Sequence, residues 1–308
     1  NMVNKNILIL GSNGLVGSSC KRILETNPSY NVVSSTRRDT NLFNLGDTKK
    51  LIKTVDPDIL IIAAARVGGI HANSTKRVQF LLENLKINMN ILESCIDNNS
   101  IKIINLGSSC IYPLNASNPI NEDAIMTGIL EPTNSPYAMA KLTAIELGRS
   151  LSIQYGHSVI NLMPTNLYGP NDNFSEMDSH VIPALIHRMH KAKEQKHVEF
   201  LIWGTGKPLR EFLYVDDLAN CINLVIEQDI KEDLLNIGSG EEVSILQLSE
   251  IIKEVVGYEG VLSFDSAKPD GNPRKLLDSK LINSYGWKPE ISLQKGIENT
   301  YSWYKENI

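Results

Sequence analysis

Short apolar runs alternate with longer amphipathic segments along the first half of the chain. Continuous apolar runs are typical of strands buried on both faces, and apolar residues recurring every three or four positions are typical of helices. The pattern predicts strands at 6–10, 30–35, 59–65, 102–106 and 159–163, and helices at 15–26, 47–55, 77–98 and 137–155. Parallel neighbours in a sheet need a crossover connection, so this alternation indicates βαβ units and a parallel sheet.

The pattern becomes irregular after Pro164. Short strands are expected at 199–204 and 212–215, and a helix at 248–256 follows the capping box that begins at Ser244. We therefore predict an α/β protein with a Rossmann-type, doubly wound parallel sheet. Residues 1–166 would form its dinucleotide-binding domain, to which later segments return, and residues 167–308 would form mainly a smaller substrate-binding lobe. Ligands of such folds bind at the carboxyl edge of the sheet, so the cleft should lie between these two parts.

Composition narrows the class of protein. Of the 308 residues 42% are hydrophobic and 21% are charged, which is ordinary for a globular protein and excludes disordered or fibrous classes. The net charge of −5 without a basic block argues against nucleic acid or a membrane surface as partner. The start of the chain has no signal-peptide pattern, and its four cysteines are scattered, which suits a cytoplasmic location.

A glycine-rich turn directly follows the first strand and leads into a helix. It reads Gly11-Ser-Asn-Gly14-Leu-Val-Gly17. In dinucleotide-binding turns the first glycine permits the tight turn, the second lets the backbone approach a pyrophosphate, and the third lets helix and strand pack closely. The helix start adds free N–H donors for the phosphates. The expected cofactor contacts here are Gly11, Asn13, Gly14, Leu15, Val16 and Gly17. The alternative is a turn that needs its glycines for steric reasons alone.

The end of the second strand favours NADPH over NADH. An NAD-specific site carries an acidic residue there for the ribose hydroxyls. This chain has Arg37 and Arg38 instead, and two guanidiniums suit a 2′-phosphate. The alternative is a pair of solvated surface arginines.

Tyr137 and Lys141 are four residues apart at the start of a predicted helix and therefore share a face. A phenol is a poor acid–base group near neutral pH unless a cation favours its phenolate, and Lys141 is expected to lower the Tyr137 pKa in this way. Ser108, after the fourth strand, would polarise a substrate carbonyl. Taken alone, the Tyr-Lys spacing also fits a solvated helix face.

These motifs, with longer blocks, carry a family resemblance. The blocks lie at 63–73, 106–113, 130–134, 163–174, 179–184, 203–206, 210–213, 268–271 and 273–278. The chain resembles the extended short-chain dehydrogenase/reductase family, and within it the 3,5-epimerase/4-reductases that convert GDP-4-keto-6-deoxy-D-mannose to GDP-L-fucose. The likeness extends over essentially the whole chain.

The resemblance implies an NADPH-dependent oxidoreductase with epimerase activity. Ser108, Tyr137 and Lys141 become its reductase triad, Cys110 the epimerase base and His180 the paired acid. A C4 ketone acidifies the C3 and C5 protons, so one Cys–His pair would serve both centres. The alternatives are a small buried side chain for Cys110 and a surface histidine for His180.

The resemblance also assigns binding residues. Further cofactor contacts would be Asn41, Leu42, Ala63, Ala64, Lys141, Pro164, Thr165, Asn166, Leu167 and His180. The GDP-sugar would contact Arg188, Trp203, Arg210 and Asp278, each of which could instead be structural. No histidine spacing indicates a metal site. Helices 77–98 and 137–155 would pair in a homodimer, as in other members of the family.

Two other functions stay open. One is a C4-ketoreductase without epimerisation that acts on a related GDP-4-keto sugar, such as a heptose, because a pocket discriminates one extra hydroxymethyl group only modestly. The other is a non-catalytic NADPH-binding sensor on the same fold. The presence of both Tyr137 and Lys141 argues against the sensor.

Overall fold

The computed structural model describes residues 4–308. In chain order its strands are β1 Lys5–Leu10, β2 Tyr30–Ser35, β3 Ile59–Ile62, β4 Lys102–Leu106, β5 Ser158–Pro164, β6 Asn166–Tyr168, β7 Glu199–Trp203, β8 Leu209–Tyr214, β9 Leu234–Ile237, β10 Glu242–Ser244 and β11 Val261–Asp265. The helices are α1 Leu15–Leu24, α2 Leu45–Val55, α3 Ile70–Thr75, α4 Arg77–Ser94, α5 Ser135–Tyr155, α6 Val181–Glu194, α7 Val215–Glu227, α8 Ile245–Val256, α9 Lys280–Ser284 and α10 Leu293–Asn307, with 3₁₀ turns η1 Ser109–Ile111 and η2 Glu122–Ala124.

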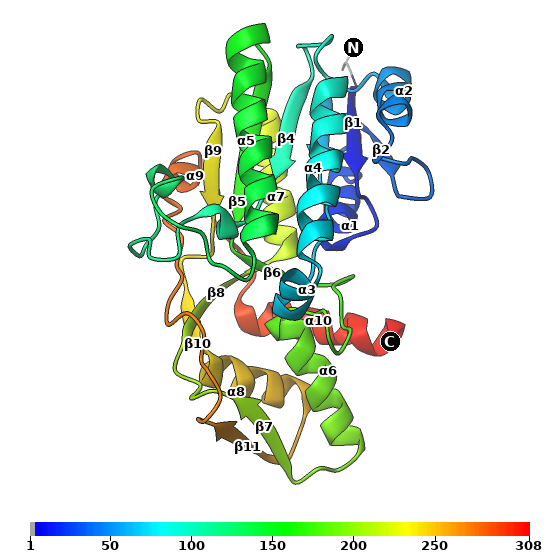
Figure 1. The fold of residues 1–308 in the computed structure, drawn as a ribbon. Coiled ribbons are helices and arrows are strands. Elements are labelled where there is room, and N and C mark those ends of the chain that lie inside the picture. The colour runs from blue at the N-terminus through cyan, green and yellow to red at the C-terminus, as the bar shows by residue number, and fades with distance from the viewer. Residues whose placement is uncertain (1–3) are drawn as a thin grey trace.

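A six-stranded sheet in the order β2-β1-β3-β4-β5-β9 forms the larger part of the molecule, and all its pairs are parallel (Figure 1). This confirms the predicted α/β class. Alternate residues of β1 face opposite layers: Ile7 packs in the cluster with α1 and α7, and Leu8 packs with α2, α4 and α5. Burial on both faces explains why the strand is apolar throughout.

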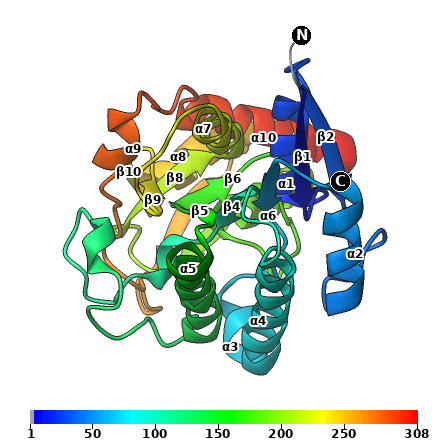
Figure 2. The same ribbon diagram turned by 90° about the horizontal axis from the view of Figure 1, so that it is seen from above.

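Segments late in the sequence return to this sheet. β9 adds its sixth strand beside β5, and α7 packs against α1 on one face (Figure 2). The change from sheet to lobe is therefore not a single point along the chain.

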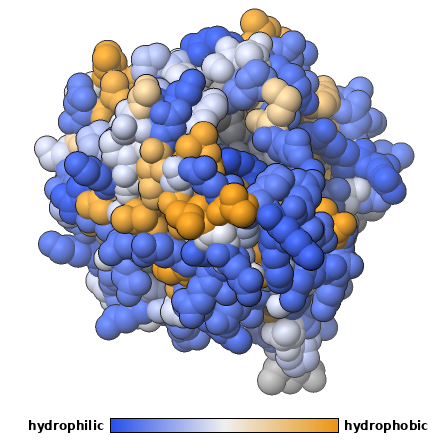
Figure 3. Space-filling model, turned by 90° about the horizontal axis from the view of Figure 1, so that it is seen from below, coloured by the Kyte–Doolittle hydropathy of each residue, from blue (hydrophilic) through white to orange (hydrophobic). Residues whose placement is uncertain are grey.

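The smaller lobe holds β7, β8, β10 and β11 with α6, α8 and α10, around a core rich in aromatic side chains. The first strand of a three-stranded sheet, β10-β8-β6, is β6, which follows β5 after one residue. A two-stranded sheet pairs β11 with β7. Figure 3 shows that the lobe end of the molecule is mostly hydrophilic, with a band of apolar side chains across it. No helix among residues 4–308 is long and apolar enough to span a bilayer.

Several element bounds differ from those expected. The third strand ends at Ile62 and not at Ala65, because Ala63 and Ala64 pack against the turn at Gly11. The helix expected at 248–256 begins at Ile245, directly after its capping residue Ser244. The helices α6 and α10 were not predicted.

Candidate active site

The chain leaves four neighbouring parallel strands at the same edge of the sheet. Gly11 follows β1, Ala63 follows β3, Gly107 follows β4 and Thr165 follows β5. In Figure 1 this edge faces the smaller lobe. The carboxyl edge of a doubly wound sheet is where ligands bind. The candidate site residues from the first half of the sequence therefore converge on one edge of the sheet.

The three glycines of the turn have different reasons to be glycine. Gly11 has φ +83°, and a Cβ there would lie 2.7 Å from the Ala64 backbone. A Cβ at Gly17 would lie 1.9 Å from the Gly11 carbonyl oxygen. A Cβ at Gly14 would meet no protein atom closer than 3.9 Å, so folding does not require glycine there. The space beside Gly14 is what a closely approaching ligand needs.

The start of α1 is built to receive an anion. Its N-cap, Gly14, provides no side-chain cap, and its first turn, which contains Leu15 and Val16, has no acidic residue. The first N–H groups of the helix are therefore free donors at the positive end of its dipole. Arg37 and Arg38 are exposed just after β2, the strand beside β1. These donors and cations fit the pyrophosphate and the 2′-phosphate of NADP.

The other predicted cofactor residues lie on loops at this edge. Asn41 is exposed with its side chain turned to the Phe43 N–H, and Leu42 packs against the sheet core. After Pro164, the side chains of Thr165 and Asn166 both donate to the Glu211 carbonyl, at 3.2 and 3.0 Å. Leu167 packs on the core of the large sheet. The link between sheet and lobe is thus held in place by β8.

The predicted triad is assembled from two segments. Lys141 is only 2% exposed, and its ammonium donates to the Leu106 carbonyl at 3.1 Å. It also lies 5.6 Å from the centre of the Tyr137 ring. Ser108 lies two residues after the end of β4 and caps η1, where its hydroxyl accepts from the Cys110 N–H at 3.3 Å. The end of β4 and the start of α5 therefore bring together the three residues and Cys110.

The Tyr137 pKa differs from the expectation. Burial raises the pKa of the phenol, and the neighbouring Cys110 adds to the rise, while Lys141 contributes no lowering. Burial also lowers the pKa of Lys141 to about 8. The ammonium is engaged by the Leu106 carbonyl, and burial of the phenol, not the attraction that we predicted, sets the direction of the shift. A phenol that keeps its proton is suited to act as a general acid.

Cys110 and His180 stand on opposite parts of the structure. Cys110 is 7% exposed, and burial raises its pKa, while Lys275, Ser108 and Lys141 act against that rise. His180 is the exposed N-cap residue of α6, and partial desolvation lowers its pKa below 6.5. No direct interaction joins the two among the described residues.

The predicted GDP-sugar residues lie in the lobe and on the segment that joins it to α9. Arg188 donates to the Leu201 carbonyl, Trp203 is 67% exposed, and Arg210 donates to the Asn272 carbonyl at 2.6 Å. The Asp278 carboxylate accepts from the Lys280 N–H at the start of α9. Asp278 thus has a structural partner already, and the Lys268 ammonium lies 5.1 Å from the centre of the Trp203 ring.

One charged residue beside the site, Lys275, was not predicted from the sequence. Lys275 interacts electrostatically with Cys110, Arg210 and Glu131. It lies within the block 273–278, so its position in that block was the available signal.

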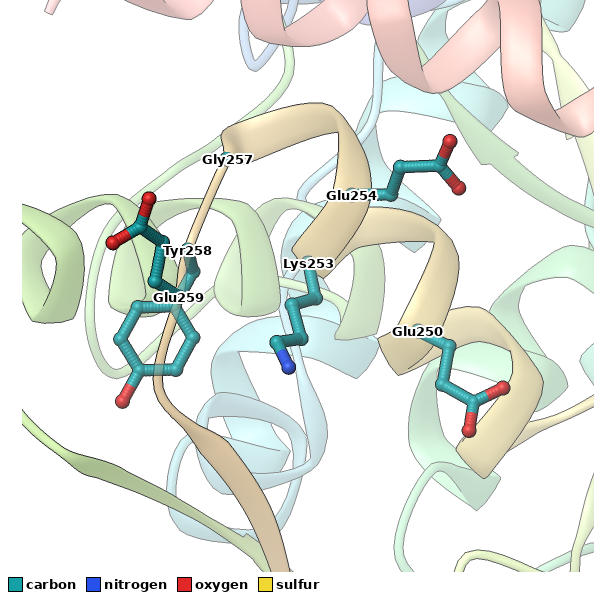
Figure 4. A pocket seen from close by; sticks show the side chains of 6 residues that line it. All are labelled: Glu250, Lys253, Glu254, Gly257, Tyr258 and Glu259. Atoms are coloured by element: carbon teal, nitrogen blue, oxygen red, sulfur yellow. The ribbon is translucent and has the colours of Figure 1, made fainter.

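A surface hollow at the end of α8 is separate from these residues. It is lined by Glu250, Lys253, Glu254, Gly257, Tyr258 and Glu259. Figure 4 shows that these side chains point in different directions and do not converge on one point. Within residues 4–308, no three His, Cys, Asp or Glu side chains gather as a metal-binding group.

Comparison with known proteins agrees with this geometry. Residues 7–238 match the model of the NAD dependent epimerase/dehydratase family. The chain is 47% identical to GDP-L-fucose synthase 1 of Arabidopsis thaliana, over 98% of this chain and 94% of that protein. Two solved structures with NADP bound are similar. A GDP-L-fucose synthetase from Naegleria fowleri has TM-score 0.90 and 30% identity, over 98% of this chain and 94% of that one. MlghC, a GDP-mannoheptose C4 reductase from Campylobacter jejuni, has TM-score 0.89 and 33% identity, over 98% and 99%. The chain belongs to the NAD-dependent epimerase/dehydratase family of extended short-chain dehydrogenases/reductases.

Proposed function

We propose that this protein is an NADPH-dependent 3,5-epimerase/4-reductase that converts GDP-4-keto-6-deoxy-D-mannose to GDP-L-fucose. The observation that carries the proposal is the junction of Ser108, Tyr137 and Lys141 with Cys110 at the end of β4. One cluster then holds the groups for carbonyl reduction and a base for proton abstraction. The full-length likeness to GDP-L-fucose synthases supports the substrate.

Epimerisation needs a base on one face of the sugar and an acid on the other. The Cys110 thiolate takes the proton from C3 or C5, and the electron pair moves to the C4 oxygen as an enolate. Ser108 and the Tyr137 phenol stabilise that oxygen by hydrogen bonds. His180, across the cleft, returns a proton to the opposite face, which inverts the carbon.

Reduction uses the same oxygen site. NADPH, when bound at the glycine turn, supplies the hydride for C4. Tyr137 gives its proton to the C4 oxygen as the carbonyl becomes a hydroxyl. Its raised pKa keeps that proton available at neutral pH. Lys141, buried beneath the Tyr137 ring, holds positive charge beside the reacting groups.

A C4-ketoreductase acting on a GDP-4-keto-heptose is the second candidate, and the similarity to MlghC favours it. The test is to incubate the protein with NADPH and GDP-4-keto-6-deoxy-D-mannose and to determine the product's stereochemistry by NMR. The L-galacto product at C3, C4 and C5 supports the bifunctional enzyme. A product reduced at C4 with C3 and C5 unchanged supports the reductase alone. If NADPH is oxidised neither with this sugar nor with a GDP-4-keto-heptose, both candidates are rejected.

We further propose that the protein is a cytoplasmic homodimer that binds no nucleic acid. Supporting the dimer, Val78, Leu82 and Met89 of α4 are exposed on one helix face, and Met139 of α5 is exposed nearby. Figure 2 shows α4 and α5 side by side on the outside of the sheet. Light scattering of the protein tests this state. A monomer at micromolar concentration would reject the dimer.

A further inference from the structure

Lys275 is held beside the active site by the residues on either side of it. On one side, the Arg210 guanidinium donates to the Asn272 carbonyl at 2.6 Å, and the Leu209 N–H donates to the Pro273 carbonyl. On the other side, the Leu277 N–H donates to the buried Glu211 carboxylate. The position of Lys275 along the cleft is therefore fixed by the backbone.

Leu277, two residues after Lys275, packs against the loop that carries Cys110. Leu277 shares one hydrophobic cluster with Ile111 and Tyr112, which directly follow Cys110. Leu277 also forms a parallel β-bridge with Ile120. The packing brings the segment of Lys275 and the thiol together, although the two residues are 165 positions apart in the sequence.

The two neighbouring cations of this segment have different partners. Arg274 forms an ion pair with Glu242 of β10 at 2.6 Å, at the surface. Lys275 is partly buried and has no hydrogen bond or ion pair to any residue that the structure describes. The nearby Glu131 carboxylate is occupied by the Thr133 and Asn134 N–H groups. Lys275 thus has no direct ion-pair partner among the described residues, and its charge interacts with the Cys110 thiol, with Arg210 and with Glu131.

The charged and titratable groups around Cys110 are few. Lys275 faces it from the 272–278 segment, Lys141 and Tyr137 face it from α5, and Ser108 belongs to its own loop. Among the structure's other buried cysteines, Cys20 and Cys95 have no cation beside them, and burial raises their pKa to about 12. Cys110 is distinguished by the cations.

We propose that Lys275 is a positioning residue for epimerisation, whose ammonium stabilises the Cys110 thiolate and so makes this cysteine a base. The proposal rests on the proposed function for its catalytic meaning, but its electrostatic part holds without substrate. Lys275 acts only through Cys110 and takes no part in hydride transfer. A nearby opposite charge typically lowers a pKa by about 1 to 3 units. Removing it should lower the thiolate fraction at neutral pH by about tenfold or more.

The experiment titrates Cys110 in the full-length protein without substrate. The thiolate is followed by its ultraviolet absorbance as the pH is raised. The absorbance of the same protein with Cys110→Ser is subtracted, and the difference gives the pKa of Cys110. Lys275→Met should raise the pKa, and Lys275→Arg should leave it close to wild type. Arg274→Met is the matched control, because it removes the adjacent cation and should not move the pKa. Lys275→Gln replaces the Met variant if that variant fails to fold.

Proton exchange gives a second readout. In deuterated water, Lys275→Met should incorporate deuterium at C3 and C5 at least about tenfold more slowly than wild type. An unchanged thiol pKa in Lys275→Met, or an equal rise in Arg274→Met, would overturn the proposal. So would an effect confined to the KM for the GDP-sugar, which would make Lys275 a phosphate ligand. If the wild type neither exchanges nor reduces, the proposed function fails, while the titration still decides the role of Lys275.

Discussion

The cofactor side and the sugar side of the cleft are constructed in different ways. On the cofactor side, each segment lies at the end of a strand of the parallel sheet or near the start of a helix beside it. These segments are 11–17, 106–110 and 137–141. On the sugar side, His180, Arg210 and Lys275 come from a helix start, a strand of the lobe and an extended segment far along the chain. The first side is specified by regular elements, and the second by hydrogen bonds between loops.

The two sides therefore differ in how closely their residues are tied to the folding of the sheet. Backbone contacts leave no room for a side chain at Gly11 or Gly17, so these positions are tied to the sheet itself. The segment that carries Lys275 is instead held by bonds such as the Leu276 N–H to the Asn118 side chain at 2.7 Å. We expect substitutions at Gly11 or Gly17 to lower the melting temperature, and substitutions in the segment of Lys275 to change catalysis.

The largest effect is expected for Tyr137→Phe. The change removes the proton donor to the C4 oxygen but keeps the ring. NADPH oxidation should fall by about 10²–10⁴-fold, the usual contribution of a general acid. Deuterium exchange at C3 and C5 should continue more slowly, because Ser108 still stabilises the enolate oxygen, and the melting temperature should stay near wild type. If both reactions are retained, Tyr137 is not the acid.

Cys110→Ser should give the reverse result. A serine hydroxyl is a much weaker acid than a thiol, so the base is lost and exchange should fall by about 100-fold or more. Reduction of the C4 ketone should continue, with a product that is not inverted. Mass spectrometry of the product measures the exchange, and persistence of deuterium incorporation would assign the base elsewhere.

The pH dependence of reduction should follow Lys141. Its pKa is lowered to about 8, so the ammonium is present below that pH and is lost as the pH rises through it. Hydride transfer should then decline by about tenfold for each further pH unit. Lys141→Arg cannot lose its charge and should remove this alkaline decline from the residual activity. An identical decline in the Arg variant would assign it to another group.

The smallest effects should distinguish the glycines. Gly17→Ala forces a Cβ against the Gly11 carbonyl oxygen and should destabilise the fold by about 1–3 kcal/mol, lowering the melting temperature by several degrees. Gly14→Ala meets no close protein atom, so it should fold normally and raise the KM for NADPH. Equal melting temperatures for the two variants would contradict this division.

The sequence pattern predicted the cofactor side well, because β1, β3 and β4 are almost wholly buried and therefore apolar, and the turns after β1 and β4 carry recognisable glycines. The strands at 30–35 and 102–106 have the expected bounds. Helix α6, which carries His180 at its N-cap, was not predicted. Its start has no side-chain cap, and its first turn has no acidic residue, so the usual signals are missing.

Charge interactions were the least predictable feature of the site. The spacing of Tyr137 and Lys141 placed them together correctly, but the predicted direction of the Tyr137 pKa shift was wrong, because burial and the neighbouring Cys110 raise the pKa. Lys275 was not identified, because only the folded chain brings its segment against the loop of Cys110. Burial and long-range packing are not encoded in local spacing.

The central claim is that one cleft inverts two carbons and reduces a third. The direct test is the reaction of the wild-type protein with NADPH and GDP-4-keto-6-deoxy-D-mannose in deuterated water, followed by NMR of the product. Deuterium at both C3 and C5, with the hydrogen at C4 derived from NADPH, is the predicted result. A product that is reduced at C4 and carries no deuterium at C3 or C5 would contradict the account.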